Sequence, residues 1–363
     1  MTDSADELSN HSQLSRLPAL PSEELAIGAF PSIMDPSVKT CLVMSPGRGQ
    51  AAFELERRYP GARVISWYVD SHRSSKASAM AQSQSTRVEI VCSADLPEVV
   101  VDLVVLPVLK NGEAEMNRDL LQQSYQRLRI GGHLVAAVNS PQDQWLLAQM
   151  QALFAKVHCQ QTEAGWSYVA KKKSELKKVR SFAAEIEFRA DGRLLKTFSR
   201  PSMFAHRSID NAARVMMREV VIPEGANVLE MGCGNGAVAL AAALRSRTGQ
   251  VYAVDCNARS IQCVESAVAA NEITNLTAIL NHDGELDVLP CDIALLNPPY
   301  YGNFAISEHF IQTASNCLRP GGDVWVVTKQ TDKYEDQNWP NLYCDSVKTV
   351  QGYDLICYRK SGN

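Results

Sequence analysis

The sequence predicts two α/β domains in tandem, each built on a mostly parallel β-sheet with helices on both faces. Two observations predict this fold class. Short apolar strands alternate with helical segments along both halves of the chain, and several segments of the first half recur in the second half in the same order. With 363 residues, of which 45% are hydrophobic, each half is long enough to bury its own core.

The repeat consists of three pairs of similar segments. Residues 41–49 (CLVMSPGRG) resemble residues 228–236 (VLEMGCGNG), at an offset of 187 positions. Two further pairs lie at an offset of 190 positions: 128–134 with 318–324 and 102–107 with 292–298. Two unrelated α/β domains with similar strands and turns are the alternative. The collinear order favours a gene duplication.

The second half shows the alternation most clearly. We expect strands at 227–231, 250–254, 276–280, 293–296 and 324–328, and helices at 237–247, 258–271 and 307–318. Such a series forms a parallel sheet, and ligands of these sheets bind at the carboxyl ends of the strands, near the point where the strand order reverses.

A basic segment separates the two halves. Residues 171–218 hold thirteen Lys and Arg against five Asp and Glu, in a chain whose net charge is −4. We therefore divide the chain into a first domain at 1–170, a basic linker at 171–200 and a second domain at 201–363. The linker is either a solvated connection or a strip that faces nucleic-acid phosphates. The candidate RNA-binding residues are Lys171, Lys172, Lys173, Lys177 and Lys178.

Composition excludes several other classes of protein. No apolar run approaches the ~20 residues of a membrane span, and the polar residues 1–20 resemble neither a secretory signal nor a transit peptide. The ten cysteines form no CxxC pair, so we expect reduced thiols, a cytoplasmic protein and no metal site.

A glycine-rich loop follows the first strand of the second half. It reads Glu230-Met-Gly-Cys-Gly-Asn-Gly236, and its glycines Gly232, Gly234 and Gly236 suit a tight turn that a ligand approaches closely. Asp255 ends the next expected strand, where a carboxylate can accept hydrogen bonds from both hydroxyls of a ribose. Dinucleotide-binding enzymes use a similar loop, so a nicotinamide cofactor is the alternative.

A second motif, Asn297-Pro-Pro-Tyr300, follows the apolar run 293–296. The prolines stiffen the chain, so the Asn297 side chain and the Pro298 carbonyl become fixed hydrogen-bond acceptors, and Tyr300 offers a stacking face. We expect His282 and His309 to be structural or peripheral.

Together these motifs resemble those of class I S-adenosylmethionine-dependent methyltransferases, which carry an E/D-x-G-x-G-x-G loop. The resemblance implies S-adenosylmethionine as the cofactor, Glu230 near its amino-acid part, Asp255 on its ribose and Asp283 on its adenine amino group; a plain turn at Asp283-Gly284 is the alternative. Members with N-P-P-[FYW] methylate planar nitrogens, which implies catalytic roles for Asn297, Pro298 and Tyr300.

The tandem layout resembles a family of bacterial guanine-N2 methyltransferases of ribosomal RNA, the type-C methyltransferases of the small subunit and their relatives for the large one. The resemblance includes the segments Pro201-Ser-Met-Phe204 and Ile209-Asp210, and it implies that Phe204 and Asp210 help to close the cofactor pocket. Ser202 replaces the usual glycine of this family, and Tyr300 replaces its more common phenylalanine.

The first half lacks these motifs. Val43, Ser45 and Tyr68 stand opposite Glu230, Gly232 and Asp255. Residues 106–109 (LPVL) replace the tetrapeptide. We therefore expect a degenerate, non-catalytic copy that supports folding or RNA recognition. In the alternative, Asp70 takes the role of Asp255 and the copy still binds cofactor.

The predicted function is methyl transfer to guanine N2 in ribosomal RNA by a monomeric protein that binds ribosomal RNA or a ribosomal subunit. Methylation of adenine N6 or of a protein glutamine is an alternative, because both reactions use the N-P-P-Y motif. A non-catalytic RNA-binding or assembly factor is another.

Overall fold

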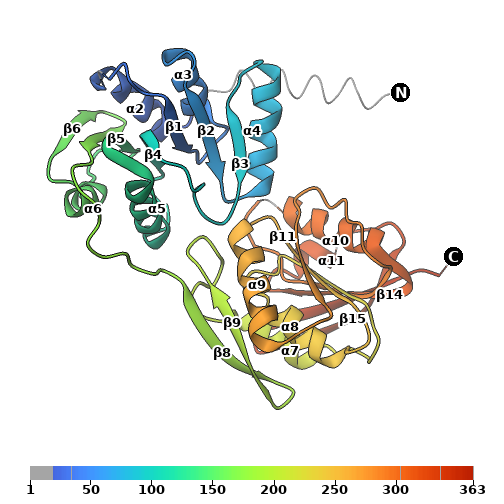
Figure 1. Ribbon diagram of the computed structural model, residues 1–363. Helices are drawn as coiled ribbons and strands as arrows, with labels where there is room; N and C mark the ends of the chain where they lie inside the picture. Colours follow the sequence, from blue (N-terminus) through green and yellow to red (C-terminus); the bar gives the residue numbers. More distant parts are fainter. Residues whose placement is uncertain (1–18, 34, 303, 336, 363) are drawn as a thin grey trace. The chain divides into compact units, whose positions relative to one another are not determined.

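A computed structural model describes residues 19–33, 35–302, 304–335 and 337–362. The chain divides into two compact units, the first ending at Phe182 and the second beginning at Ala183. Each unit is one α/β domain (Figure 1). In the described part of the chain, every helix is too short or too polar to cross a bilayer.

The first unit holds a seven-stranded sheet in the order β3-β2-β1-β4-β5-β7-β6. Its strands are β1 (Thr40–Met44), β2 (Arg63–Tyr68), β3 (Glu89–Cys92), β4 (Val101–Val108), β5 (Leu128–Val138), β6 (Val157–Thr162) and β7 (Gly165–Lys171). Its helices are α2 (Pro21–Ala29), the 3-10 helix η1 (Phe30–Ser32), α3 (Gln50–Arg58), α4 (Ser71–Ser83), α5 (Ala114–Arg127) and α6 (Trp145–Leu153).

The second unit repeats this topology in the order β12-β11-β10-β13-β14-β16-β15. Its strands are β10 (Val228–Met231), β11 (Val251–Asp255), β12 (Leu276–Leu280), β13 (Cys291–Leu296), β14 (Leu318–Thr328), β15 (Leu342–Val350) and β16 (Tyr353–Lys360). Its helices are α7 (Asn211–Glu219), α8 (Ala237–Arg245), α9 (Ala258–Asn271), α10 (Ala305–Cys317) and α11 (Asp332–Glu335). In each sheet the first five strands of the order pair in parallel, and the sixth strand, β7 or β16, pairs antiparallel with both of its neighbours. The predicted fold of two doubly wound, mostly parallel sheets is confirmed.

Both faces of the second sheet are buried. Val228 packs in one core cluster, together with residues of α7, α8 and α9. Its neighbour Leu229 packs in a second cluster on the other face, with residues of α10. Successive side chains of a strand point to opposite faces, so a strand covered on both sides must be apolar throughout. Glu230 is therefore the exception that needs an explanation.

The boundary between the units differs from the one we expected. Residues 184–199 are not part of a linker, because they form the hairpin β8 (Ala184–Ala190) and β9 (Arg193–Ser199) of the second unit. Leu195 joins the core of that unit, and Asn271 of α9 exchanges hydrogen bonds with the backbone of Lys196, at 2.9 and 2.6 Å. The basic composition of the segment concealed this hairpin.

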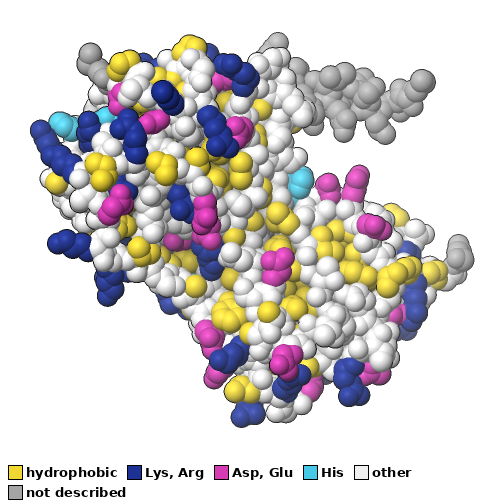
Figure 2. All heavy atoms as spheres, in the orientation of Figure 1, with side chains coloured by type: hydrophobic (Ala, Val, Ile, Leu, Met, Phe, Trp, Pro, Cys, Tyr) yellow, Lys and Arg dark blue, Asp and Glu magenta, His cyan; other side chains and the backbone are white. Residues whose placement is uncertain are grey.

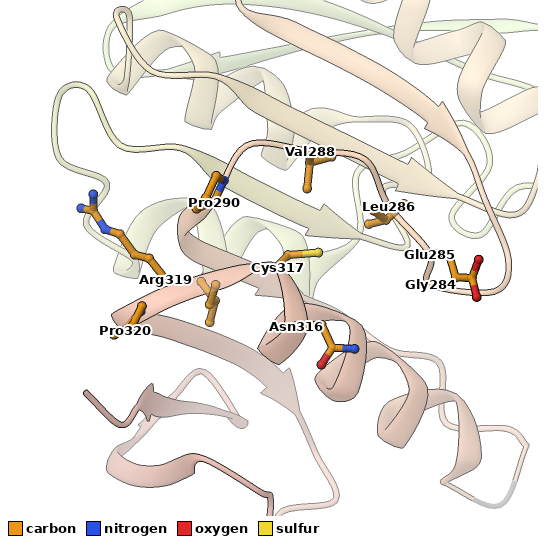
Figure 3. A pocket seen from close by; sticks show the side chains of 10 residues that line it. Gly284, Glu285, Leu286, Val288, Pro290, Asn316, Cys317, Arg319 and Pro320 are labelled. Carbon is orange, nitrogen blue, oxygen red and sulfur yellow. The ribbon is translucent and has the colours of Figure 1, made fainter. Parts of the chain in front are cut away.

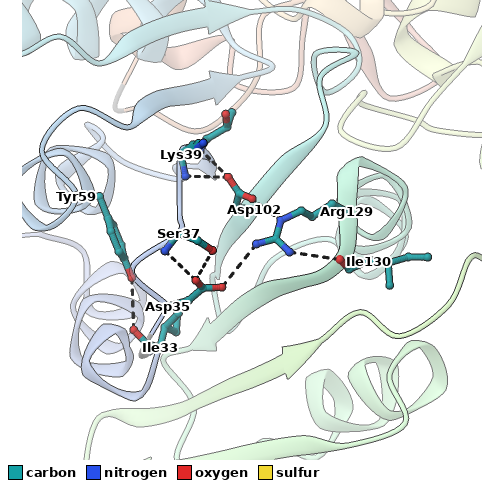
Figure 4. Close-up of polar contacts among 9 residues, drawn as sticks. Ile33, Asp35, Ser37, Lys39, Tyr59, Asp102, Arg129 and Ile130 are labelled. Atoms are coloured by element: carbon teal, nitrogen blue, oxygen red, sulfur yellow. Dashed lines mark hydrogen bonds and ion pairs between the residues drawn. The ribbon is translucent and has the colours of Figure 1, made fainter.

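Both units share an acid–arginine clamp at the amino end of a central strand. In the first unit, Asp102 accepts hydrogen bonds from the backbone amides of Lys39 and Thr40, at 2.8 and 2.9 Å, and pairs with Arg129 (Figure 4). In the second unit, Asp292 accepts from the amide of Asn227, at 2.7 Å, and pairs with Arg319. This clamp is the structural basis of the repeated Asp and Leu-Arg segments in the sequence.

The paired glycines of the repeat also have a packing role. A Cβ atom at Gly132 would lie 2.9 Å from the carbonyl oxygen of Asp102, and one at Gly322 would lie 3.0 Å from that of Asp292. Only glycine lets the two backbones approach so closely. The two units therefore share the contacts that join neighbouring strands.

We predict that Asp102→Ala lowers the free energy of unfolding by about 2–3 kcal/mol, because it leaves two amides and a guanidinium without their acceptor. Glu89→Ala removes an exposed ion pair with Arg63 and should cost less than about 1 kcal/mol. Urea unfolding of the whole chain measures both values, and hydrogen exchange of the β1 amides assigns the loss to the first unit.

The same variant has a pH signature. Burial alone would raise the pKa of the Asp102 carboxyl, but hydrogen bonds from Arg129 and the two amides lower it below its ordinary value of 3.8. The stabilisation is therefore present above that pH and is lost as the pH falls further. A loss for Asp102→Ala no larger than that for Glu89→Ala would contradict a structural role of the clamp.

Candidate active site

The carboxyl ends of β10 and β13 define the candidate site. These strands are adjacent although β11 and β12 lie between them in the sequence, so the strand order reverses here. Met231, the last residue of β10, pairs with Leu296, the last residue of β13. The glycine loop and Asn297 therefore start at the same level of the sheet, which brings the two predicted motifs together.

The three loop glycines all have positive φ angles, of 73° for Gly232, 52° for Gly234 and 73° for Gly236. A Cβ atom at Gly232 would lie 2.9 Å from the Phe310 ring, and one at Gly236 would lie 2.7 Å from Val264. At Gly234 no atom lies within 4 Å of that position. The outer glycines thus allow tight packing, whereas Gly234 leaves open space that a ligand can enter.

Glu230 is buried under this loop. Its Oε2 atom has no hydrogen-bond partner, while the backbone of Ala239 bonds the carboxyl. Burial raises the pKa of Glu230 to about 8, with a smaller contribution from the charge of Asp255. Burying a carboxyl with an unused acceptor costs free energy as long as no ligand is bound. Such a carboxyl suits a ligand that carries an ammonium group.

Asp255 ends β11 beside the loop. Its Oδ2 accepts from the Gly234 amide and its Oδ1 from the Asn257 amide, both at 2.9 Å. These bonds fix the orientation of the carboxylate at the carboxyl end of β11. The geometry fits the ribose role that the sequence suggested.

Asn297 is held by a residue from a distant part of the chain. Its Nδ2 atom donates to Oδ2 of Asp210, at 2.9 Å. Asp210 is also the N-cap of α7, where the same oxygen accepts from the amides of Ala212 and Ala213. Pro298 is buried next to Asn297.

Tyr300 is half exposed, at 47%. Burial raises the pKa of its hydroxyl, and a hydrogen bond from the backbone of Lys329 acts in the opposite direction. The side chain is thus partly buried and still presents part of its ring to solvent.

The segment 200–208 is anchored to the start of α9. Asn257 donates to the carbonyl and hydroxyl oxygens of Ser202, at 3.0 and 3.1 Å, and the buried Arg259 donates to the carbonyl of Pro201, at 2.9 Å. Ser202 has a φ angle of 86°, which explains why glycine suits this position in the family. Phe204 is 76% exposed.

Asp283 lies in a turn after β12. Its Oδ1 accepts from the side chain of Asn281 and from the amide of Glu285, at 2.8 and 3.0 Å, and these bonds, the one from Glu285 first, lower its pKa. The carboxylate stabilises its own turn through Oδ1, as the alternative of a plain turn requires.

The basic segment is ordered along the first unit. The hydroxyl of Tyr125 donates to the carbonyl of Ser174, at 2.8 Å, and the side chain of Gln122 bonds both backbone groups of Arg180. Lys171, Lys173, Lys177 and Lys178 are exposed. Lys172 is a correction to the predicted RNA-binding set: it is 1% exposed, and its Nζ bonds the carbonyl of Leu128 and the carboxylate of Glu175.

The corresponding region of the first unit is filled by protein side chains. Tyr68, which stands opposite Asp255, is buried, and its hydroxyl lies 2.9 Å from the Cβ position of Gly49. Ser45 donates to the fully buried Glu23, at 2.6 Å. Asp70 caps α4 by accepting from the Arg73 amide.

Some contributors were not found from the sequence. Asn257 carries a recognisable signal, since an Asn before a helical pattern is a typical N-cap. Arg259 and Lys329 carry no such signal, because their contacts come from the fold.

A cavity of about 550 Å³ between residues 284–290 and 316–320 (Figure 3) lies at the amino end of β13, because Leu318 pairs with Cys291. It is thus at the opposite end of this strand from Asn297. Among the described ranges, no three His, Cys, Asp or Glu side chains form a potential metal site.

In its sheet topology and in the glycine loop at the switch point, the second unit resembles an α/β methyltransferase domain. Residues 195–355 match the family model described as Methyltransferase small domain. The match covers most of the second unit, and the resemblance to methyltransferases noted in the sequence is confirmed for this part of the chain.

Two relatives and a solved structure also resemble parts of the chain. The Ribosomal RNA large subunit methyltransferase G of Shewanella amazonensis is 32% identical over 37% of this chain and 37% of its own length. The Ribosomal RNA small subunit methyltransferase C of Pseudomonas putida is 25% identical over 52% of this chain and 57% of its own length. The chain thus spans about a third to just over half of these relatives.

The T. thermophilus 16S rRNA N2 G1207 methyltransferase, solved in complex with AdoMet and guanosine, aligns with 96% of this chain and 93% of its own, with a TM-score of 0.75 and 19% identity. At this level of identity the match concerns the fold, and it extends over both units.

Proposed function

We propose that this protein transfers a methyl group from S-adenosylmethionine to the exocyclic N2 amine of a guanine in ribosomal RNA, with the small subunit as the first candidate. One observation carries the proposal: the register of β10 and β13 sets the glycine loop that follows Glu230 level with Asn297, and the neighbouring strand β11 ends beside this loop at Asp255. A donor site and an acceptor site for a planar amine thus meet at one edge of the sheet.

The residues present fit the cofactor. The unpartnered Oε2 of Glu230 suits the ammonium group of S-adenosylmethionine, and the fixed carboxylate of Asp255 suits its ribose. The open space at Gly234 lets the cofactor approach the backbone closely. When bound, S-adenosylmethionine supplies a methyl group on a positively charged sulfur, which keeps the electron pair of the broken C–S bond. Phe204 and Asp283 are proposed to border the same pocket.

The tetrapeptide acts on the acceptor. An exocyclic amine is a poor nucleophile because its lone pair is delocalised into the base. Oδ1 of Asn297 and the Pro298 carbonyl accept its N–H bonds, which stabilises the positive charge that develops as the N–C bond forms. Tyr300 stacks on the base, an interaction worth about 1–3 kcal/mol. The surplus proton leaves the methylated amine for water.

We assign a supporting role to the first unit. Tyr68 and Ser45 are buried where the second unit has Asp255 and Gly232, so we expect this unit neither to bind the cofactor nor to catalyse. Its exposed lysines Lys171, Lys173, Lys177 and Lys178 are proposed to contact RNA phosphates. On the face drawn in Figure 2, acidic and basic side chains are interspersed, with Lys and Arg along one edge of the first unit. An enzyme that acts on ribosomal RNA is expected in the cytoplasm.

The activity is tested by incubating the protein with labelled S-adenosylmethionine and unmodified transcripts of both ribosomal RNAs, or subunits that lack modifications, and by mapping the product by mass spectrometry. We expect label on guanine N2. Label on adenine or on protein alone would reject the guanine assignment. Cofactor binding without transfer to any of these substrates would favour a non-catalytic RNA-binding factor.

We predict that cofactor affinity increases with pH. Glu230 binds an ammonium group as a carboxylate, and its pKa near 8 keeps most of it protonated in the free protein at pH 7. The dissociation constant should fall by up to about tenfold per pH unit below pH 8, and Glu230→Gln should flatten this dependence. Calorimetry in two buffers of different ionisation enthalpy should also detect a released proton.

The stability of the cofactor-free protein provides the control. A raised carboxyl pKa means that the native state loses stability as the pH rises from about 4.5 to 8. Glu230→Gln should therefore stabilise the free protein most at the upper end of this range. If cofactor binding depended on pH equally in the wild-type protein and in Glu230→Gln, Glu230 would not bind the cofactor.

We predict that replacing Lys171, Lys173, Lys177 and Lys178 by glutamine weakens RNA binding and flattens its salt dependence by up to about 3 in the log–log slope, because four phosphate contacts are lost. The matched control replaces Lys39, Lys76, Lys110 and Lys156, four exposed lysines elsewhere on the same unit. Filter binding between 50 and 300 mM salt, roughly the range over which such slopes are resolved, measures both. Equal slopes for the two variants would indicate that the segment is a solvated connection and does not contact RNA phosphates.

A further inference from the structure

The bond between Asp210 and Asn297 joins residues that are 87 positions apart in the sequence. Oδ2 of Asp210 is the acceptor for three donors: the Asn297 amide at 2.9 Å, the Ala212 backbone at 3.1 Å and the Ala213 backbone at 3.3 Å. The start of α7 thus fixes the carboxylate, and the carboxylate in turn fixes the asparagine. Asn235 adds rigidity, since its side chain donates to the carbonyl of Ser208, at 3.1 Å.

The bond decides which end of the Asn297 amide is available. The oxygen and the nitrogen of an asparagine side chain have nearly the same shape, but one accepts hydrogen bonds and the other donates them. A carboxylate can only accept, so it selects Nδ2 and leaves Oδ1 for another partner. With the opposite orientation, Asn297 would present N–H groups to the N–H groups of a substrate amine, and the two would repel.

We propose that Asp210 is a positioning residue, which holds Asn297 in the one amide orientation that accepts an N–H bond of the substrate amine. This inference rests on the proposed function. It differs from the role that the family resemblance suggested, in which Asp210 closes the cofactor pocket. The carboxylate also polarises the amide it bonds, which strengthens Oδ1 as an acceptor.

Two variants separate this role from the capping of α7. In Asp210→Ser, the hydroxyl remains a good N-cap, but it is one bond shorter and does not reach Asn297. In Asp210→Asn, a carbonyl oxygen of the same reach accepts both from the helix and from Nδ2. We expect Asp210→Ser to lower kcat about 10- to 100-fold, the range for a lost hydrogen bond to a charged group, and Asp210→Asn to restore most of it.

The readouts distinguish a positioning role from a structural one. The dissociation constant of S-adenosylmethionine and the melting temperature should stay near the wild-type values in Asp210→Ser, while kcat falls. The double variant Asp210→Ser/Asn297→Ala should be no slower than Asn297→Ala alone, because Asp210 acts through Asn297.

Three results would overturn the inference: wild-type turnover in Asp210→Ser, multiplied losses in the double variant, or a loss of cofactor affinity that accounts for the slower reaction. All rates are measured on the RNA that the wild-type protein methylates. A wild-type protein that methylates no RNA refutes the proposed function instead, so the two failures are distinguishable.

Discussion

The pairing of β10 with β13 is the constraint on which the site depends. Parallel neighbours in register end at the same level, and here the pair Met231 and Leu296 is followed on one side by the glycine loop and on the other by Asn297. A shift of one residue would turn every side chain of β13 to the other face of the sheet. The apolar residues on both faces prevent such a shift, because each would lose its core contacts. The rigid core of the sheet therefore sets the distance between the donor and the acceptor side of the reaction.

The two units show which contacts a duplicated fold retains. The acid–arginine clamp and the close approach of the paired glycines occur in both, at Asp102 and Gly132 and again at Asp292 and Gly322. These contacts lie at the amino ends of the strands and serve folding. The carboxyl ends have diverged, since Tyr68 now fills the space beside Gly49. The shared contacts and the proposed site lie at opposite ends of the strands, so a change at one end leaves the other intact.

Each unit also buries one glutamate beside its loop, with different consequences. Burial raises the pKa of Glu23 in the first unit and of Glu230 in the second. Glu23 receives a hydrogen bond from Ser45, at 2.6 Å, a partner supplied by the protein itself. Glu230 has a backbone partner for one oxygen and none for the other. In the proposed enzyme, the cofactor provides the missing partner, so the cost of burying the acid is offset only when the site is filled.

The sequence by itself determined the alternation of strands and helices, the duplication and the two motifs, because these depend on the spacing of apolar residues and on the backbone freedom of glycine and proline. It could not show that 184–199 is a hairpin of the second unit, because a basic segment can have the same composition in a linker and in a packed strand. It could not show that Lys172 is buried either, because the burial of a lysine depends on contacts with residues that are distant in the sequence. Nor could it pair Asp210 with Asn297. That contact exists only because α7 and β13 meet in the folded unit, and tertiary structure alone brings together residues so far apart in the chain.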